Sequence, residues 1–159
     1  MKKTLTALTF LAFVATSGVS TAFAGDKETV ESFYAFLSNP ASDSYAATFK
    51  AGVSEDWQSI GDYSGKFKTA DQLIGQLKGM SKLLPDLNWK IEEMIEAGDK
   101  IIVRGRATAT PTGPLFGVDG KGKSFEIMSI DIHTLKDGKI VTTHHIEDWA
   151  GALQQLKGK

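Results

Sequence analysis

The most informative absence in this chain is cysteine, which does not occur among its 159 residues. This absence excludes a disulfide scaffold, a thiolate metal site, a cysteine nucleophile and a lipid anchor on an amino-terminal cysteine. An excess of basic charge is also lacking, because 18 lysine and arginine residues stand against 19 aspartate and glutamate residues. A surface for nucleic acid needs clustered positive charge, so we expect no nucleic-acid partner.

The sequence signatures of several enzyme classes are missing as well. There is no GxSxG nucleophile elbow, no Walker sequence and no dinucleotide-binding fingerprint. The glycine-rich stretch 117–122 is interpreted as a connection between strands, because no helical pattern follows it to complete a phosphate site. None of these catalytic classes is therefore indicated by the sequence.

No apolar run reaches the roughly 20 residues that a membrane-spanning helix needs. The longest one, residues 5–15, follows Lys2 and Lys3 and precedes small residues that end in Ala22-Phe23-Ala24. This three-part layout predicts a secretory signal peptide over residues 1–24, cleaved after Ala24. An uncleaved anchor or a cytosolic amphipathic helix is the alternative. We expect a bacterial periplasmic or secreted protein with no stable membrane insertion after cleavage.

Residues 25–159 are predicted to form one domain. Removing the signal peptide leaves about 135 residues, within the usual size of a single domain, and takes away two lysines, so the mature chain is mildly acidic. No internal repeat, low-complexity segment or linker divides this region.

Helical patterns dominate the first half of this domain. Val30, Phe33, Tyr34 and Leu37 recur at helical spacing, which predicts an amphipathic helix from Asp26 to Leu37. A short second helix is expected to start at residue 42 or 43. We expect it to turn three residues inward: Tyr45, Ala46 and Phe49.

The next segments are a strand and a third helix. Residues 53–60 are expected to form a strand anchored by Trp57, whose side chain is a candidate for the wall of a pocket. Thr69 and Gln72 fit a capping box, and the helix that follows should continue to Pro85.

Two further strands, 87–97 and 100–110, flank Gly98-Asp99. A two-residue loop would mix apolar and polar residues on each face, so we prefer a three-residue loop that keeps one face apolar. That register places Glu92 opposite Arg106 and leaves Glu93 as the one carboxylate on the apolar side, a candidate pocket residue. A β-bulge or an error of register is the alternative for Glu93.

The stretch 125–156 carries most side chains capable of acid–base chemistry. Asp137-Gly138 lies between two alternating patterns, a strong signal for a hairpin with a two-residue turn. An uninterrupted register then places three cross-strand pairs on one face: Asp131 with His144, Ser129 with Ile146, and Ile127 with Asp148.

Three residues of that face are candidate catalytic groups: Asp131, His144 and Asp148. A carboxylate beside an imidazole raises the imidazole pKa and orients the ring, and an apolar surrounding would raise the pKa of Asp148. An ion pair that only satisfies a half-buried sheet is the alternative. His145 would point to the opposite face.

The candidate ligand-pocket residues come from this face, from Glu93 and Trp57, and from the apolar tip of the loop 111–117, which should fold over an opening. They are Trp57, Glu93, Phe116, Ser129, His133 and Ile146. His133, His144 and Asp148 match neither HxH nor HExxH spacing, so we expect no metal.

An ordered set of segments resembles one known family. The set comprises Leu84-Pro85-Asp86-Leu87, the run 97–104, PTGPLFGVDGKGK, the hairpin IDIHTLKDGKI and the ending EDWAGALQQL. Together they resemble the SnoaL-like polyketide cyclase or ester cyclase family of the nuclear transport factor 2-like superfamily.

The resemblance implies an α+β fold, a cone-shaped barrel in which a curved antiparallel sheet packs on N-terminal helices. It also implies an acidic catalyst without metal or organic cofactor, placed on Asp148, and an apolar pocket for a small hydrophobic carbonyl compound in a cyclase, isomerase or hydratase reaction. The family's pocket histidine is replaced here by Ala109-Thr110-Pro111. A binding protein without catalytic activity and a homodimer formed through the exposed sheet face are the alternatives.

Overall fold

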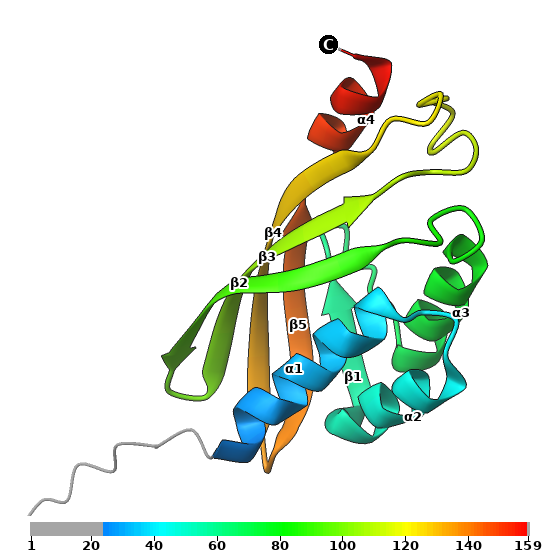
Figure 1. The fold of residues 1–159 in the computed structure, drawn as a ribbon. Coiled ribbons are helices and arrows are strands. Elements are labelled where there is room, and N and C mark those ends of the chain that lie inside the picture. Colours follow the sequence, from blue (N-terminus) through cyan, green and yellow to red (C-terminus); the bar gives the residue numbers. More distant parts are fainter. Residues whose placement is uncertain (1–23, 159) are drawn as a thin grey trace, which may run out of the picture.

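The computed structural model describes residues 24–158 (Figure 1). The predicted signal peptide therefore lies outside the described residues, apart from Ala24, where the first helix begins. The elements, in chain order, are α1 (Ala24–Ser38), α2 (Asp43–Gly52), β1 (Val53–Ile60), α3 (Ala70–Met80), β2 (Asn88–Ala97), β3 (Lys100–Ala109), β4 (Phe125–Lys136), β5 (Lys139–Glu147) and α4 (Trp149–Lys157).

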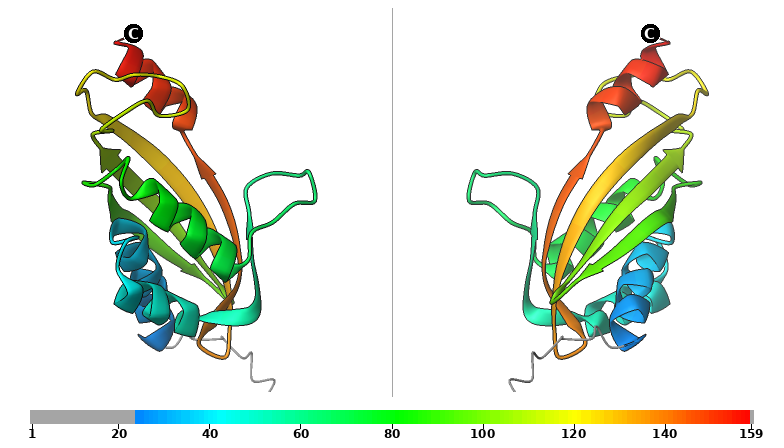
Figure 2. Two further views of the ribbon diagram at one scale, coloured as in Figure 1. Left: turned by 90° about the vertical axis from the view of Figure 1, so that its right-hand side faces the viewer. Right: turned by 90° about the vertical axis from the view of Figure 1, so that its left-hand side faces the viewer.

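The five strands form one curved sheet in the order β1-β5-β4-β3-β2. Neighbouring strands are antiparallel except β1 and β5, which are parallel. The predicted α+β class with N-terminal helices on a curved sheet is confirmed, and the sheet is mixed rather than wholly antiparallel. Figure 2 shows α1, α2 and α3 on one side of the sheet, with the connection between β1 and α3 projecting on the other.

Local sequence explains most helix boundaries. Ser42 caps α2, and the reciprocal capping box of Thr69 and Gln72 starts α3 as predicted. α3 ends at Met80 rather than before Pro85, because the backbone turns there and the Met80 carbonyl accepts from the amides of Leu83 and Leu84. Tyr45 does not face inward as predicted and is exposed.

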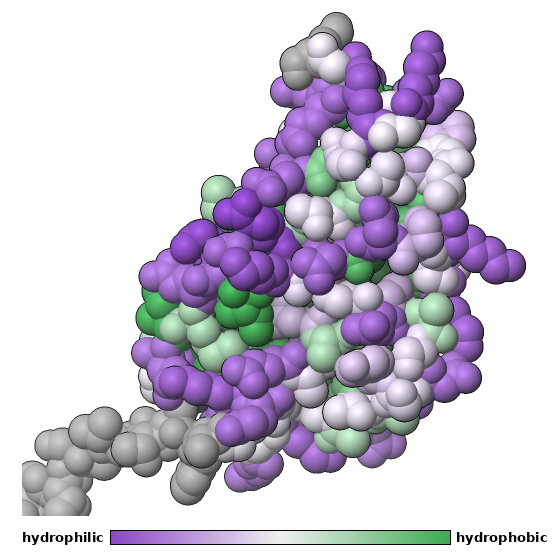
Figure 3. Space-filling model, in the orientation of Figure 1, coloured by the Kyte–Doolittle hydropathy of each residue, from purple (hydrophilic) through white to green (hydrophobic). Residues whose placement is uncertain are grey.

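Two hydrophobic clusters lie under the helices. The first joins α1, α2 and β1 to the centre of the sheet around Phe33, Phe49 and Trp57. The second joins the β3–β4 connection to α4 around Leu115 and Leu156. On the face seen in Figure 3, hydrophilic residues surround a hydrophobic patch over the β2–β3 hairpin beside α1.

The predicted register of β2 and β3 is wrong near the turn. Ala97 pairs with Lys100, so the loop has two residues, and Met94 pairs with Val103. A β-bulge between Ile91 and Glu93 then returns the apolar residues to the inner face, which is the alternative considered for Glu93. Glu93 lies on the exposed side and pairs with Arg104 rather than lining a pocket.

The predicted β4–β5 register is also wrong beyond the turn. Lys136–Lys139 and Leu135–Ile140 pair as expected, but Thr134 then pairs with Thr142, so Val141 is an extra residue. This bulge exchanges the faces of β5 from Thr142 onward. Asp131 pairs with His145 instead of His144.

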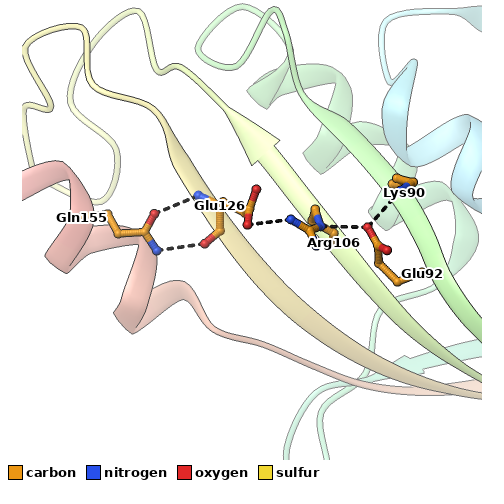
Figure 4. A network of polar contacts seen from close by, with 5 residues as sticks. All are labelled: Lys90, Glu92, Arg106, Glu126 and Gln155. Carbon is orange, nitrogen blue, oxygen red and sulfur yellow. Dashed lines mark hydrogen bonds and ion pairs between the residues drawn. The ribbon is translucent and has the colours of Figure 1, made fainter.

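Ion pairs and hydrogen bonds join β2, β3, β4 and α4 (Figure 4). Glu92 accepts from Lys90 and Arg106, at 3.2 and 2.8 Å, and Arg106 also donates to Glu126 at 2.7 Å. The predicted Glu92–Arg106 ion pair is thus confirmed, although the two residues are not direct cross-strand partners. Gln155 extends this network, because its side-chain oxygen accepts from the Glu126 amide and its side-chain nitrogen donates to the Glu126 carbonyl. These two bonds fix α4 to β4.

Candidate functional site

A cavity of about 120 Å³ opens between the helices and the inner face of the sheet. This volume is close to the roughly 150 Å³ of an engineered cavity that holds benzene. Most of the wall is apolar, and a few polar groups meet at the sheet side. The lining residues are Phe33, Leu37, Ser59, Lys68, Leu73, Gln76, Leu77, Met80, Leu87, Trp89, Phe116, Asp131, Thr143, His145, Glu147 and Trp149.

Asp131 of β4 is the most deeply buried carboxylate of this site, only 4% exposed. Its Oδ2 accepts hydrogen bonds from the Tyr34 hydroxyl at 2.7 Å and from the Ser129 hydroxyl at 3.1 Å. Oδ1 takes no part in these two bonds. Burial raises the pKa of Asp131 to about 6, against the lowering effect of the Tyr34 hydrogen bond. The group can therefore gain or lose a proton near neutral pH.

Tyr34 comes from the inward face of α1 and is itself buried. Burial is the main cause that raises the pKa of Tyr34 far above its ordinary value, and the Asp131 carboxylate adds to the effect. The phenol therefore remains protonated and acts as a permanent donor to Asp131.

A glycine makes this arrangement possible. Gly105 of β3 pairs with Ser129, and a Cβ at position 105 would lie 2.6 Å from the Ser129 hydroxyl. The missing side chain therefore leaves room for the Ser129–Asp131 hydrogen bond.

His145 and Glu147 lie on β5 beside Asp131. His145 Nδ1 is 2.9 Å from Glu147 Oε1, and this hydrogen bond is the main cause that raises the pKa of His145. Among the described residues, His145 Nε2 and Trp89 Nε1 are buried without a hydrogen-bond partner. The site thus holds two carboxylates, one imidazole and the Lys68 amine around an apolar space.

A second polar cluster lies beneath the cavity. The Trp57 indole donates to the Thr143 hydroxyl at 3.1 Å, and the same hydroxyl lies 3.0 Å from His133 Nδ1. His133 is fully buried, and burial lowers its pKa to about 3. His133 is therefore neutral, and it supports the strand that carries Thr143 to the cavity.

The structure places the predicted catalytic residues in three different surroundings. Asp131 lines the cavity as expected. His144 pairs with Ile132 and lies on the outer side of the sheet, in a shallow groove with Ile146 and Tyr63. Asp148 is the N-cap of α4, where its carboxylate accepts from the Gly151 amide at 2.8 Å.

The predicted pocket residues are divided in the same way. Phe116 lines the cavity, while Ser129, Trp57 and His133 lie directly behind its wall as partners of Asp131 and Thr143. Glu93 and Ile146 are on the outer side of the sheet, Glu93 because the two-residue turn pairs it with Arg104 and Ile146 because of the bulge in β5.

Sequence reasoning missed four ionisable residues of the site: Tyr34, Lys68, His145 and Glu147. Tyr34 was visible only as one member of a helical apolar stripe. His145 and Glu147 are two residues apart and therefore share one face of β5. Without the bulge at Val141, which the sequence does not reveal, that face would be the one opposite to Asp131. Gly105 in the middle of a strand was the available signal of a close approach.

Among residues 24–158, no three histidine, aspartate or glutamate side chains are grouped closely enough to hold a metal ion. Within the same part of the chain, no helix combines the length and hydropathy that crossing a bilayer requires.

The fold and the cavity define the class first: an α+β cone in which N-terminal helices close a small apolar pocket containing ionisable groups. The model of the SnoaL-like polyketide cyclase family matches residues 28–156, and the chain belongs to that family. The predicted family is thereby confirmed. No curated protein sequence matches the chain.

Solved structures share this fold at low sequence identity. One is a candidate SnoaL-like polyketide cyclase from Jannaschia sp. CCS1, with 20% identity and a TM-score of 0.71 over 90% of this chain and 96% of that one. TsrD from Streptomyces laurentii has 18% identity and a TM-score of 0.72 over 87% and 99%. IdmH from Streptomyces antibioticus, described as a candidate polyketide cyclase, has 21% identity and a TM-score of 0.71 over 83% and 98%.

Proposed function

We propose that this protein catalyses a proton transfer on a small apolar carbonyl compound, in a reaction of the cyclase, isomerase or hydratase type. The observation that carries the proposal is the position of Asp131, a buried carboxylate with a pKa of about 6 on the wall of an apolar cavity. A carboxylate with such a pKa is suited to act as general base near neutral pH.

In the proposed mechanism, Asp131 removes a proton from the carbon next to the carbonyl group. The electron pair of that C–H bond moves into an enolate, and Asp131 returns the proton to another carbon or to the oxygen. His145 and Lys68 place positive charge on the same cavity, which stabilises the enolate.

The test uses 3-cyclohexen-1-one, a small ketone whose conversion to 2-cyclohexen-1-one moves one proton and can be followed by ultraviolet absorbance. We expect measurable isomerisation by the wild type and a loss of about 10²–10⁴-fold in Asp131→Asn. Asp148→Asn is the matched control, because Asn also caps helices. Activity that survives Asp131→Asn but not Asp148→Asn would contradict this proposal and favour Asp148, on which the family resemblance places the acidic catalyst.

A second candidate function is binding of a small hydrophobic molecule without chemistry. It is favoured by the predominance of apolar residues in the cavity wall and by the burial of both polar nitrogens, His145 Nε2 and Trp89 Nε1. Native mass spectrometry of protein isolated from the periplasm would support this function if an unmodified ligand is retained. Conversion of that compound to product would exclude it.

We also propose export and self-association. Export depends on the predicted signal peptide, and amino-terminal sequencing of the mature protein should then begin at Gly25. Self-association is supported by a row of paired isoleucines across the outer sheet face: Ile95, Ile102 and Ile132. Ile95 is 50% exposed, although the solvated face of an antiparallel sheet is usually polar. Light scattering of Ile132→Lys should show monomers if this face forms a homodimer.

A further inference from the structure

Phe116 occupies an unusual position for a large aromatic residue. It lies at the tip of the β3–β4 connection, 61% of its surface is exposed, and it still lines the cavity. Its neighbour Leu115 is buried in the second hydrophobic cluster and holds the connection in place. Phe116 is therefore not needed for the hydrophobic core.

The backbone at Phe116 is strained. Phe116 has φ = 47° and Gly117 has φ = 81°, and Leu115 and Val118 exchange two backbone hydrogen bonds of 2.9 Å around them. Positive φ at both central positions is the geometry of a type I′ turn, for which Asn-Gly is the preferred sequence. A bulky side chain in this region is unfavourable. Strain of this kind is often retained where a side chain has a function.

The side chain of Phe116 rests on a fixed partner. Its ring centroid is 5.8 Å from that of Trp149, with an interplanar angle of 79°, an edge-to-face contact. Trp149 is the first residue of α4, which Asp148 caps and which Gln155 fastens to β4 with hydrogen bonds of 2.9 and 2.8 Å (Figure 4). Trp149 also contacts Phe125 edge to face. The cavity wall is thus rigid at Trp149, while Phe116 projects from an exposed turn.

We infer that Phe116 is the residue that selects ligands by size, closing the cavity against Trp149 to compounds longer than the space behind it. This inference rests on the proposed function only in requiring that the cavity receives a ligand. Removing the ring should open the cavity toward solvent along the β3–β4 connection. Small ligands then lose a contact, and larger ones gain access.

The test measures binding of two neutral fluorescent probes, 2-naphthol with two rings and 1-hydroxypyrene with four. In Phe116→Asn we expect about tenfold weaker binding of 2-naphthol, as for the loss of one pocket contact, and a shift of at least about tenfold in relative affinity toward 1-hydroxypyrene. The melting temperature should stay equal or rise, since asparagine suits the turn. Phe116→Tyr should resemble the wild type.

Tyr63→Asn is the matched control, because it removes a fully exposed aromatic ring from the opposite side of the sheet. It should leave both affinities unchanged. An unchanged affinity ratio in Phe116→Asn, with 2-naphthol still bound, overturns size selection by Phe116 but leaves the pocket itself intact. Binding of neither probe by the wild type contradicts the ligand pocket and this inference together.

Discussion

Asp131 and His145 stand directly opposite each other on β4 and β5, and a single extra residue in β5 produces this pairing. The Asp131 carboxylate is further bound by Tyr34 from the helix layer, and His145 is bound by Glu147 from its own strand. Burial raises the pKa of Asp131 although the Tyr34 hydrogen bond lowers it, and the Glu147 hydrogen bond raises the pKa of His145.

The first prediction concerns the stability cost of ionising Asp131. The pKa of Asp131 is about 6 in the folded protein and near 3.9 in an unfolded chain. Between these values the folded protein holds the proton and the unfolded chain does not, so the contribution of Asp131 to the free energy of unfolding falls as pH rises. Asp131→Asn removes this loss. From pH 4 to pH 8, the free energy of unfolding of the variant should therefore rise relative to that of the wild type by on the order of 2–3 kcal/mol.

Urea unfolding at several pH values measures this gain. Asp99→Asn is the control, because Asp99 is an exposed carboxylate whose substitution should give a small, nearly constant difference. A difference between Asp131→Asn and the wild type that does not change with pH would contradict the raised pKa.

The second prediction separates the histidines, of which the chain has three. Burial lowers the pKa of His133 to about 3, whereas Glu147 raises the pKa of His145 above its ordinary value. In a nuclear magnetic resonance titration, His133 should stay neutral down to pH 5 while His145 titrates. In Glu147→Gln the midpoint of His145 should move down.

The same values predict opposite effects on stability. The neutral state of buried His133 costs stability as pH falls below about 6.5, where the unfolded chain gains the proton. The charged state of His145 contributes stability at low pH and loses it as pH rises through its folded pKa. A His133 resonance that titrates near pH 6.5 would show that its surroundings are not as dry as the structure indicates.

The third prediction assigns Asp148 to helix capping. Asp148→Ala should lower the free energy of unfolding by about 1 kcal/mol, and Asp148→Asn should change it little, because both Asp and Asn accept from a first-turn amide. Thermal unfolding of the two variants provides the measurement. Equal losses in both would argue that the charge of Asp148, and not its capping bond, stabilises the protein.

The fourth prediction concerns Gly105. A methyl group there would meet the Ser129 hydroxyl at 2.6 Å and force it away from Asp131. We expect Gly105→Ala to lose about 1–3 kcal/mol of stability through overpacking. The pKa of Asp131 should also rise, since the Ser129 hydrogen bond lowers it.

Gly75→Ala is the control for this change. Gly75 lies in α3 with open space around the position of a Cβ, so alanine should stabilise the protein by up to about 1 kcal/mol. Chemical denaturation compares the two variants. If Gly105→Ala leaves the free energy of unfolding unchanged, the Ser129 hydroxyl can adopt another position that avoids the new methyl group.

Local structure that depends on short-range sequence patterns was predicted correctly. The strand at Trp57, the capping box at Thr69 and the turn at Asp137-Gly138 each depend on neighbouring residues, and all three are present in the structure. The family resemblance supplied the architecture, because it depends on the order of many segments rather than on one motif.

The site was predicted less well, because it depends on register far from the turn. A bulge adds one residue without a distinctive composition, and both His144 and His145 were compatible with a strand. The choice between them is made by packing across the sheet, where Trp57 and His133 bind Thr143. The reversed face of Glu93 has a different cause: the loop has two residues rather than the predicted three, and this register pairs Glu93 with Arg104 on the outer face.

The extra residue at Val141 has a genetic consequence. The residues of β5 from Thr142 onward are paired as if Val141 were not counted, so loss of this one codon would leave a regular strand with His145 still opposite Asp131. A deletion of three bases at this position would therefore remove the bulge without exchanging the side chains of the cavity.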